Sequence, residues 1–170
     1  MPERAFPFDN TFPRDLPGFY EPCRPARVGT PCLLYCNHGL ADELRLDLAG
    51  ATETGLAELF SGNDLPEGAE PIAQAYAGHQ FGQFNPQLGD GRALLIGEVI
   101  DIHGRRRDIA FKGSGRTPFS RRGDGKAAVG PMLREVLIGE SLHALGIATT
   151  RALAVVATGE GLWREQPHPG

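Results

Sequence analysis

The chain has 170 residues, of which 41% are hydrophobic and 22% are charged, and its formal net charge at pH 7 is −4. Such a chain can bury one domain-sized core, so its composition excludes an intrinsically disordered protein. The net negative charge argues against a general nucleic-acid-binding protein, and no apolar run approaches the length of a membrane span.

The N-terminal residues and the cysteines indicate a cytoplasmic protein. Residues 1–14 alternate prolines with charges and lack an apolar segment, so we expect no signal peptide. Cys23, Cys32 and Cys36 form an odd count without a paired C-x-x-C spacing, and the nearby His38 does not complete a zinc-binding set. We therefore predict free thiols.

Residues 1–70 are predicted to be an N-terminal extension that wraps the rest of the chain, because the first 30 residues are rich in proline. A short apolar run at residues 31–36 predicts a strand. Helical periodicity predicts two short helices, at residues 39–48 and 54–61.

Pro71 is placed as a proline in the first turn of a helix would be. We predict a helix that runs from Pro71 through Ile72 and Ala75 toward Gly78. This helix would deliver the chain into a glycine-rich loop.

The glycine-rich loop is followed by a predicted hairpin. Two apolar runs, residues 93–102 and 108–112, are separated by the tight turn His103-Gly104. Lys112 ends the second run in the string IAFK, which has the form of the V-A-I-K strand of protein kinases, where a lysine beneath a glycine-rich loop reaches the ATP phosphates. The glycines of the loop are Gly78, Gly82, Gly89, Gly91 and Gly97.

A helix is predicted from Pro131 to about Leu145, and we expect it to be mostly buried because apolar residues occupy nearly every face. A carboxylate among apolar neighbours needs a cationic partner or loses its charge. Glu135 could pair with Lys112, as a strand lysine and a helix glutamate do in kinase-like folds. Glu140 is a rival, and spacing alone favours Glu135 only slightly.

The last part of the chain is predicted to form one more strand. Gly146 is expected to end the helix, and residues 151–158 read as a strand. His143, on the helix, is expected to be a core residue. Residues 159–170 read as a loop-like tail without a closing element, so we expect the chain to be the N-terminal part of a longer enzyme.

Two basic clusters frame the hairpin. Residues 105–107 are three arginines at its turn and are predicted to be a solvated tip. Ser114 and Thr117 could add hydroxyl contacts to a ligand, although turn capping is the favoured role. The second cluster surrounds GSG and GDG turns and is a candidate for phosphate contact; its members are Arg116, Arg121, Arg122 and Lys126.

Three long strings resemble the selenoprotein O (SelO/YdiU) family: YAGHQFGQFNPQLGDGRA, FKGSGRTPFSRRGDGKA and LREVLIGESLHALGIATTRAL. The resemblance implies an α+β, protein-kinase-like fold whose N-lobe has an antiparallel sheet, a glycine-rich loop and an αC-like helix. Residues 71–170 would be this nucleotide-binding lobe, cut before the catalytic lobe. The implied activity is protein adenylylation, in which AMP moves from ATP to Ser, Thr or Tyr hydroxyls of proteins, with Mg²⁺ or Mn²⁺.

The resemblance also assigns site residues by position. The residues expected to contact ATP are Gly89, Gly91, Arg92, Lys112, Asp124 and Gly125. The glutamate that pairs with Lys112 falls on Glu135 rather than Glu140. The family's catalytic aspartate and its metal ligands are expected downstream, so the resemblance implies a fragment that is inactive alone and holds no metal itself.

Two other classes of function remain open from the sequence. One is an ATP-binding pseudokinase module without catalysis, or a protein kinase that transfers the γ-phosphoryl group instead of AMP. The other is a nucleic-acid-binding or scaffold protein that uses the arginine clusters without ATP. The favoured partners are ATP and substrate proteins, with no nucleic acid and no membrane.

Overall fold

The computed structural model describes residues 6–164 and 167–170. Its centre is a five-stranded antiparallel sheet in which β1, β3, β5 and β6 are neighbours in that order and β4 also pairs with β3. The strands are β1 (Tyr20–Pro22), β3 (Ile72–Gln80), β4 (Gln83–Gly89), β5 (Ala93–Ile100) and β6 (Arg106–Lys112).

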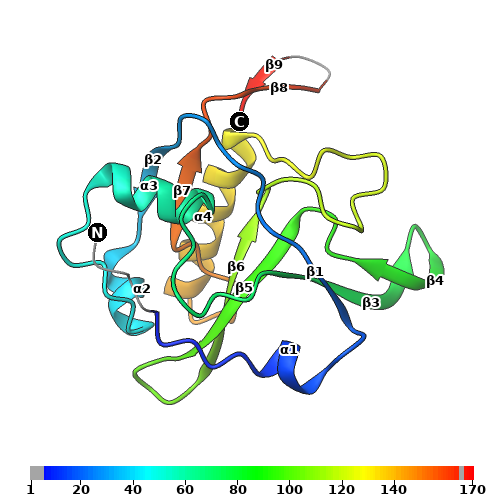
Figure 1. Cartoon of the computed structure of the whole chain (residues 1–170), viewed down its shortest axis with the longest axis horizontal. Helices are drawn as coiled ribbons and strands as arrows, with labels where there is room; N and C mark the ends of the chain where they lie inside the picture. The colour runs from blue at the N-terminus through cyan, green and yellow to red at the C-terminus, as the bar shows by residue number, and fades with distance from the viewer. Residues whose placement is uncertain (1–5, 165–166) are drawn as a thin grey trace.

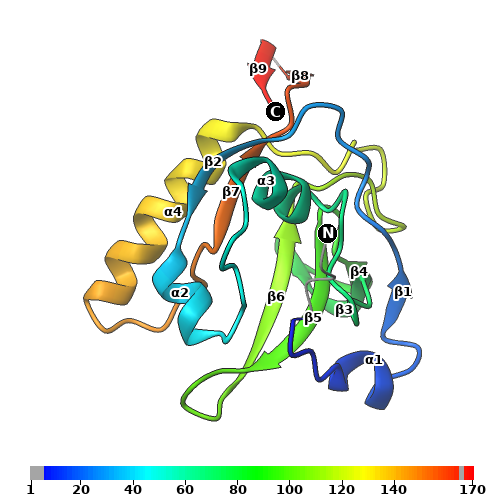
Figure 2. The same ribbon diagram turned by 60° about the vertical axis from the view of Figure 1, so that its left-hand side comes forward.

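A second, two-stranded antiparallel sheet pairs β2 (Cys32–Cys36) with β7 (Ala154–Ala157). This sheet and the longest helix lie on one side of the β5–β6 hairpin, and β1, β3 and β4 lie on the other (Figures 1 and 2). The helices are α1 (Thr11–Asp15), α2 (His38–Glu43), α3 (Glu53–Ser61) and α4 (Val129–Ala144).

The core lies between the central sheet and helices α2 and α3. Strand β5 is buried from Leu94 to Val99, as its nearly continuous apolar sequence predicts for a strand covered on both faces. The N-terminal segment is tied to this strand, because Phe8 bridges to Val99 and the side chain of Glu98 accepts hydrogen bonds from Thr11 and Phe12. Leu40, Leu44, Leu56 and Leu59 of the two helices join the same core cluster.

Several predicted elements are confirmed. The strand at residues 31–36 is β2, and the hairpin is β5–β6, paired from Ala93↔Lys112 to Ile100↔Arg106. Helix α3 begins after Thr52, whose hydroxyl accepts a hydrogen bond from the Gly55 N–H at 3.1 Å and so caps the first turn. The helix predicted at residues 39–48 is shorter than expected and ends at Glu43.

The helix predicted after Pro71 is wrong, because the segment is β3. Ile72 pairs with Pro22 of β1 and with Leu95 of β5. The backbone of this segment therefore pairs with strands on both sides and does not form the internal hydrogen bonds of a helix. A proline directly before a strand removes no ladder hydrogen bond, and the Pro71 carbonyl accepts one from the Cys23 N–H at 3.1 Å. The same proline is therefore compatible with either element.

The expected burial of α4 is also wrong. Only Val136 and Gly139 of its 16 residues are buried, whereas Leu137 and Ile138 are 67% and 60% exposed. His143, expected in the core, is exposed. The helix ends as predicted, with Gly146 in the left-handed conformation (φ 76°) just after its C-cap.

The basic turn between β5 and β6 is not simply a solvated tip. Arg105 and Arg107 both donate from Nε to Asp101 Oδ2, at 2.9 and 3.0 Å, and Asp101 is fully buried. Arg106 pairs with Asp9 of the N-terminal segment. Burial disfavours the charge of Asp101, but hydrogen bonds from these guanidinium groups and from two backbone N–H groups hold its pKa well below the ordinary value.

The end of the chain contains paired strands where a loop-like tail was expected. Strand β8 (Gly161–Trp163) pairs antiparallel with β9 (Pro167–Pro169). The strand predicted at residues 151–158 is the shorter β7. The proposed boundary at residue 70 stays a prediction, and residues 1–5 of the segment judged to lack a signal peptide lie outside the described residues.

Within residues 6–164 and 167–170, no helix combines the length and the hydrophobicity needed to cross a bilayer. The described cysteines, Cys23, Cys32 and Cys36, are free thiols.

Candidate functional site

The last residue of β6 and the second turn of α4 meet in an ion pair. Lys112 Nζ lies 2.7 and 3.0 Å from the two carboxylate oxygens of Glu135. Both side chains are about half exposed, at 43% and 50%, and a pair this open to solvent contributes at most about 1 kcal/mol to stability. Its rival, Glu140, instead pairs with Arg151 at 2.8 Å.

Gly89, the last residue of β4, and Gly91, just after it, are packed against a later loop. A Cβ atom on Gly89 would lie 2.3 Å from the ring of Phe119, and one on Gly91 would lie 3.1 Å from the Phe119 carbonyl oxygen. The absence of side chains here therefore lets the loop at residues 113–126 fold over the turn. In this structure the close approach is made by Phe119.

Hydroxyl groups fasten the same loop to the turn. Thr117 donates to the Asp90 carbonyl and accepts from the Phe119 N–H at 3.1 Å, and Ser120 donates to the Gly91 carbonyl. Turn capping by Thr117 is thus confirmed. Ser114 differs, because its hydroxyl is buried and has no hydrogen-bond partner among the described residues. The capping role expected for Ser114 is wrong.

The predicted residues lie around one end of the β5–β6 hairpin. The Gly113 N–H donates to the Arg92 carbonyl at 2.7 Å, which joins the residue after Lys112 to the residue before β5. Ser114 bridges to Lys126, and this contact brings the GDG turn to the same end. Gly125 must be glycine, because it has φ 68° and a Cβ atom there would lie 1.9 Å from the Gly115 oxygen.

Asp124, a predicted ATP contact, is engaged by an arginine that sequence reasoning missed. Arg164 donates from both terminal nitrogens to the two carboxylate oxygens of Asp124, at 2.8 and 2.9 Å. These hydrogen bonds hold the pKa of Asp124 below its ordinary value. Arg164 directly follows β8 within the tail predicted to be a loop, and it is 40 residues from Asp124 in sequence, so no local signal marks this contact.

A cavity of about 390 Å³ lies between β6 and α4. Lys112 and Glu135 line it together with Ser114 and Lys126, beside apolar residues that include Phe111 and Val136. Of the predicted ATP contacts, only Lys112 belongs to this lining. Gly89, Gly91, Arg92, Asp124 and Gly125 lie outside the cavity.

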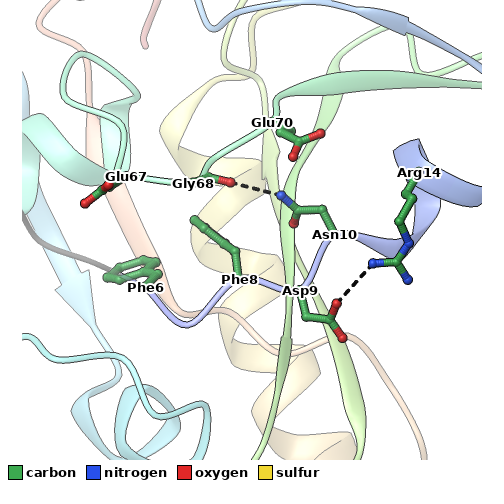
Figure 3. Close-up of a pocket in the computed structure, with 8 residues that line it drawn as sticks. All are labelled: Phe6, Phe8, Asp9, Asn10, Arg14, Glu67, Gly68 and Glu70. Carbon is green, nitrogen blue, oxygen red and sulfur yellow. Dashed lines mark hydrogen bonds and ion pairs between the residues drawn. The ribbon is translucent and has the colours of Figure 1, made fainter.

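A second, more open hollow of about 670 Å³ lies where the N-terminal segment passes residues 67–70 (Figure 3). It contains none of the predicted residues. Two contacts join polar groups in it: Asp9 pairs with Arg14 at 3.4 Å, and the Asn10 amide donates to the Gly68 carbonyl at 2.9 Å. The second contact connects the N-terminal segment to residues 67–70.

The described residues hold no complete set of metal ligands. They bring together no group of three or more His, Cys, Asp or Glu side chains that could hold a metal ion. Mg²⁺ is commonly bound by one or two carboxylates together with the phosphates of a nucleotide, so the Mg²⁺ or Mn²⁺ that the resemblance implies would need ligands from the nucleotide or from outside these residues.

A family model described as "Protein adenylyltransferase SelO" matches residues 4–170. The chain belongs to this family. The resemblance read from the three sequence strings is thus confirmed, and the mixed fold of helices and antiparallel sheets is compatible with the expected α+β N-lobe.

Close relatives carry one name, "Protein nucleotidyltransferase YdiU". The chain is 68% identical to the protein of Chromobacterium violaceum over 156 residues, 91% of this chain and 32% of the relative. It is 65% identical to that of Cereibacter sphaeroides over 162 residues (95% and 34%) and 60% identical to that of Rhizobium meliloti over 166 residues (98% and 34%). The chain spans about a third of the length of these relatives.

Proposed function

We propose that this chain is the ATP-binding lobe of a protein adenylyltransferase, which moves AMP from ATP to Ser, Thr or Tyr hydroxyls of substrate proteins. The observation that carries the proposal is the Lys112–Glu135 pair at the end of the hairpin. Membership of the SelO family and the nucleotidyltransferase name of its relatives support it. Substrate proteins are the proposed partners.

The chemistry requires fixed positive charge. Attack of a hydroxyl on the α-phosphorus of ATP builds negative charge on the phosphate oxygens and expels pyrophosphate. Two cations would stabilise this charge. One is Lys112, which Glu135 holds in place, and the other is the exposed Arg92, which precedes Ala93, the strand partner of Lys112. Asp124 accepts hydrogen bonds and repels phosphate, so with Gly125 it would contact the nucleoside rather than the phosphates.

No residue of this chain is assigned as catalytic. The described residues bring together no group of three or more His, Cys, Asp or Glu side chains that could hold Mg²⁺ or Mn²⁺ by themselves. Residues outside this chain would hold the metal and activate the attacking hydroxyl, and we expect the chain alone to be inactive.

The test is incubation of the full-length protein with ATP labelled at the α-phosphate or, separately, at the γ-phosphate. Label transferred to protein from the α-phosphate alone supports the proposal. Transfer from the γ-phosphate alone would make the protein a kinase, and nucleotide binding without transfer would make it a pseudokinase module.

Lys112→Ala should abolish AMP transfer without unfolding the protein, as judged by circular dichroism. Arg134→Ala is the matched control, because Arg134 is an exposed cation beside Glu135 in the same helix. Transfer by the Lys112 variant at the wild-type rate contradicts the assignment of this lysine.

A further inference from the structure

Helix α4 is attached to the rest of the described chain by few buried side chains. Its two buried residues are Val136 and Gly139, on the side where the helix contacts β7 and the segment before it. The approach is closest at Gly139, where a Cβ atom would lie 2.9 Å from the Thr150 carbonyl oxygen. Most of the apolar surface of the helix is open, so burial alone holds it weakly.

Two ion pairs lie one at each end of this short contact, and Asn37 adds a longer hydrogen bond to Glu140 at 3.4 Å. Lys112 holds Glu135, and Arg151 holds Glu140 with both prongs of its guanidinium group, from Nε at 3.0 Å and from Nη2 at 2.8 Å. Arg151 is only 19% exposed, and its hydrogen bonds lower the pKa of Glu140. A two-pronged pair shielded from water is stronger and more directional than a surface pair.

Arg151 is itself anchored to the body of the domain. Its guanidinium group also reaches Glu43 of α2, at 3.4 Å. Glu43 accepts from Arg105 at 3.1 Å, and Arg105 bonds to the buried Asp101 at the hairpin turn. The connected charges therefore run from the turn of the central sheet, through α2, to α4.

We propose that Arg151 is a positioning residue: by holding Glu140 it fixes α4 so that Glu135 meets Lys112. The proposal rests on the proposed function in that Lys112 contacts ATP. Glu135 and Glu140 are five residues apart, which corresponds to a rise of about 7.5 Å and a rotation of roughly 140° along the helix. Two ion pairs on different sides of a rigid helix oppose both its translation along its axis and its rotation about that axis.

Loss of Arg151 would leave Glu140 without its cation and α4 free to roll about its small buried contact. Glu135 would then meet Lys112 for a smaller fraction of the time. The affinity for ATP would fall, and the whole loss would come from the weaker contact of Glu135 with Lys112.

The experiment compares Arg151→Gln and Arg107→Gln in the full-length protein. Arg107 belongs to the same set of charges and bonds to Asp101, but it has no described contact with α4. We expect Arg151→Gln to weaken ATP binding at least about fivefold, the lower end of couplings between linked sites, and to speed hydrogen exchange of residues 129–144. Arg107→Gln should change neither.

The decisive measurement is a double-mutant cycle with Glu135→Gln. If Arg151 acts through Glu135, Arg151→Gln should change ATP affinity less than about twofold in the Glu135→Gln background. An equal loss in both backgrounds, or unchanged exchange of α4, overturns the proposal. Glu140→Gln tests the same contact if the Arg151 variant does not fold.

The two proposals fail in different ways. A wild-type protein that does not bind ATP contradicts the proposed function, and hydrogen exchange of α4 then decides the positioning role by itself. A wild-type protein that binds ATP through Lys112 while Arg151→Gln leaves α4 unchanged contradicts only the positioning role.

Discussion

Gly139→Ala should destabilise the protein, although alanine is the better helix former. Alanine in place of glycine in a helix interior stabilises by about 1 kcal/mol. Here the new Cβ atom would lie 2.9 Å from the Thr150 oxygen, whereas ordinary contacts begin near 3.4 Å. The oxygen belongs to the backbone and cannot rotate away, so α4 or the segment before β7 must shift by about 0.5 Å, and overpacking of this kind costs about 1–3 kcal/mol. The net loss is about 1 kcal/mol.

Gly130→Ala is the matched control in the same helix. A Cβ atom on Gly130 meets nothing within 4 Å apart from its chain neighbours, so the substitution lacks the clash of Gly139→Ala. Gly130 lies in the first turn directly before Pro131, where a residue with a Cβ atom is disfavoured in the helical conformation, so the helix-propensity gain is offset and we expect a change close to zero. The two variants therefore differ by about 1 kcal/mol, and with a urea dependence of about 2 kcal/mol per molar their unfolding midpoints should be about 0.5 M apart by circular dichroism. A Gly139→Ala midpoint at or above that of the wild type would refute the close approach.

Two further predictions concern buried polar groups. Ser114→Ala should leave the free energy of unfolding unchanged or raise it, because the substitution removes a buried hydroxyl without a described partner. Thr117→Val should instead lower the free energy of unfolding by roughly 1–3 kcal/mol, because it leaves the Asp90 carbonyl and the Phe119 N–H unpaired. Equal losses in urea unfolding would contradict this contrast. The lowered pKa of Asp101 means that its carboxylate contributes stability above the ordinary carboxyl pKa of about 3.9, and this stability is lost as the pH falls toward the lower folded pKa. Asp101→Asn should therefore be less stable at pH 7 and lose less of its Tm between pH 5 and pH 2, and an unchanged acid slope would argue against the contact.

The hairpin and the glutamate assignment show what local pattern can establish. Two apolar runs and a His-Gly turn were sufficient to predict β5–β6 and the position of Lys112 at its end. Spacing could not separate Glu135 from Glu140, since both lie among apolar residues on one helix. The structure gives each its own cation, and the cation of Glu140 comes from Arg151, beyond the helix end. The choice depends on tertiary contacts that helical periodicity does not contain.

The errors have a common physical origin. Pro71 fits the start of a helix or a strand, and pairing with β1 and β5 decided for the strand. The arginines at residues 105–107 were predicted to be a solvated tip because they lie at the hairpin turn, whereas Asp101 is buried there and binds Arg105 and Arg107. Arg164 gave no signal because its partner, Asp124, lies 40 residues earlier. In each case the outcome was set by tertiary pairing or burial that the local pattern does not contain, and for Pro71 and Arg164 the partners come from distant segments. The roles in nucleotide binding predicted for Gly89, Gly91, Arg92, Lys112, Asp124 and Gly125 stay predictions.

The exposed apolar face of α4 was the largest departure from expectation, and it bears on how the site is positioned. Apolar residues on every face show what a helix can bury, but not which faces are covered. With only Val136 and Gly139 buried, the hydrophobic contact is small and, being non-directional, tolerates rotation of the helix. A two-pronged guanidinium–carboxylate pair has a preferred geometry and therefore does not tolerate such rotation. The orientation of Glu135 toward Lys112 thus depends on charged contacts more than on packing, which is why Arg151, remote in sequence from Lys112, matters for the site.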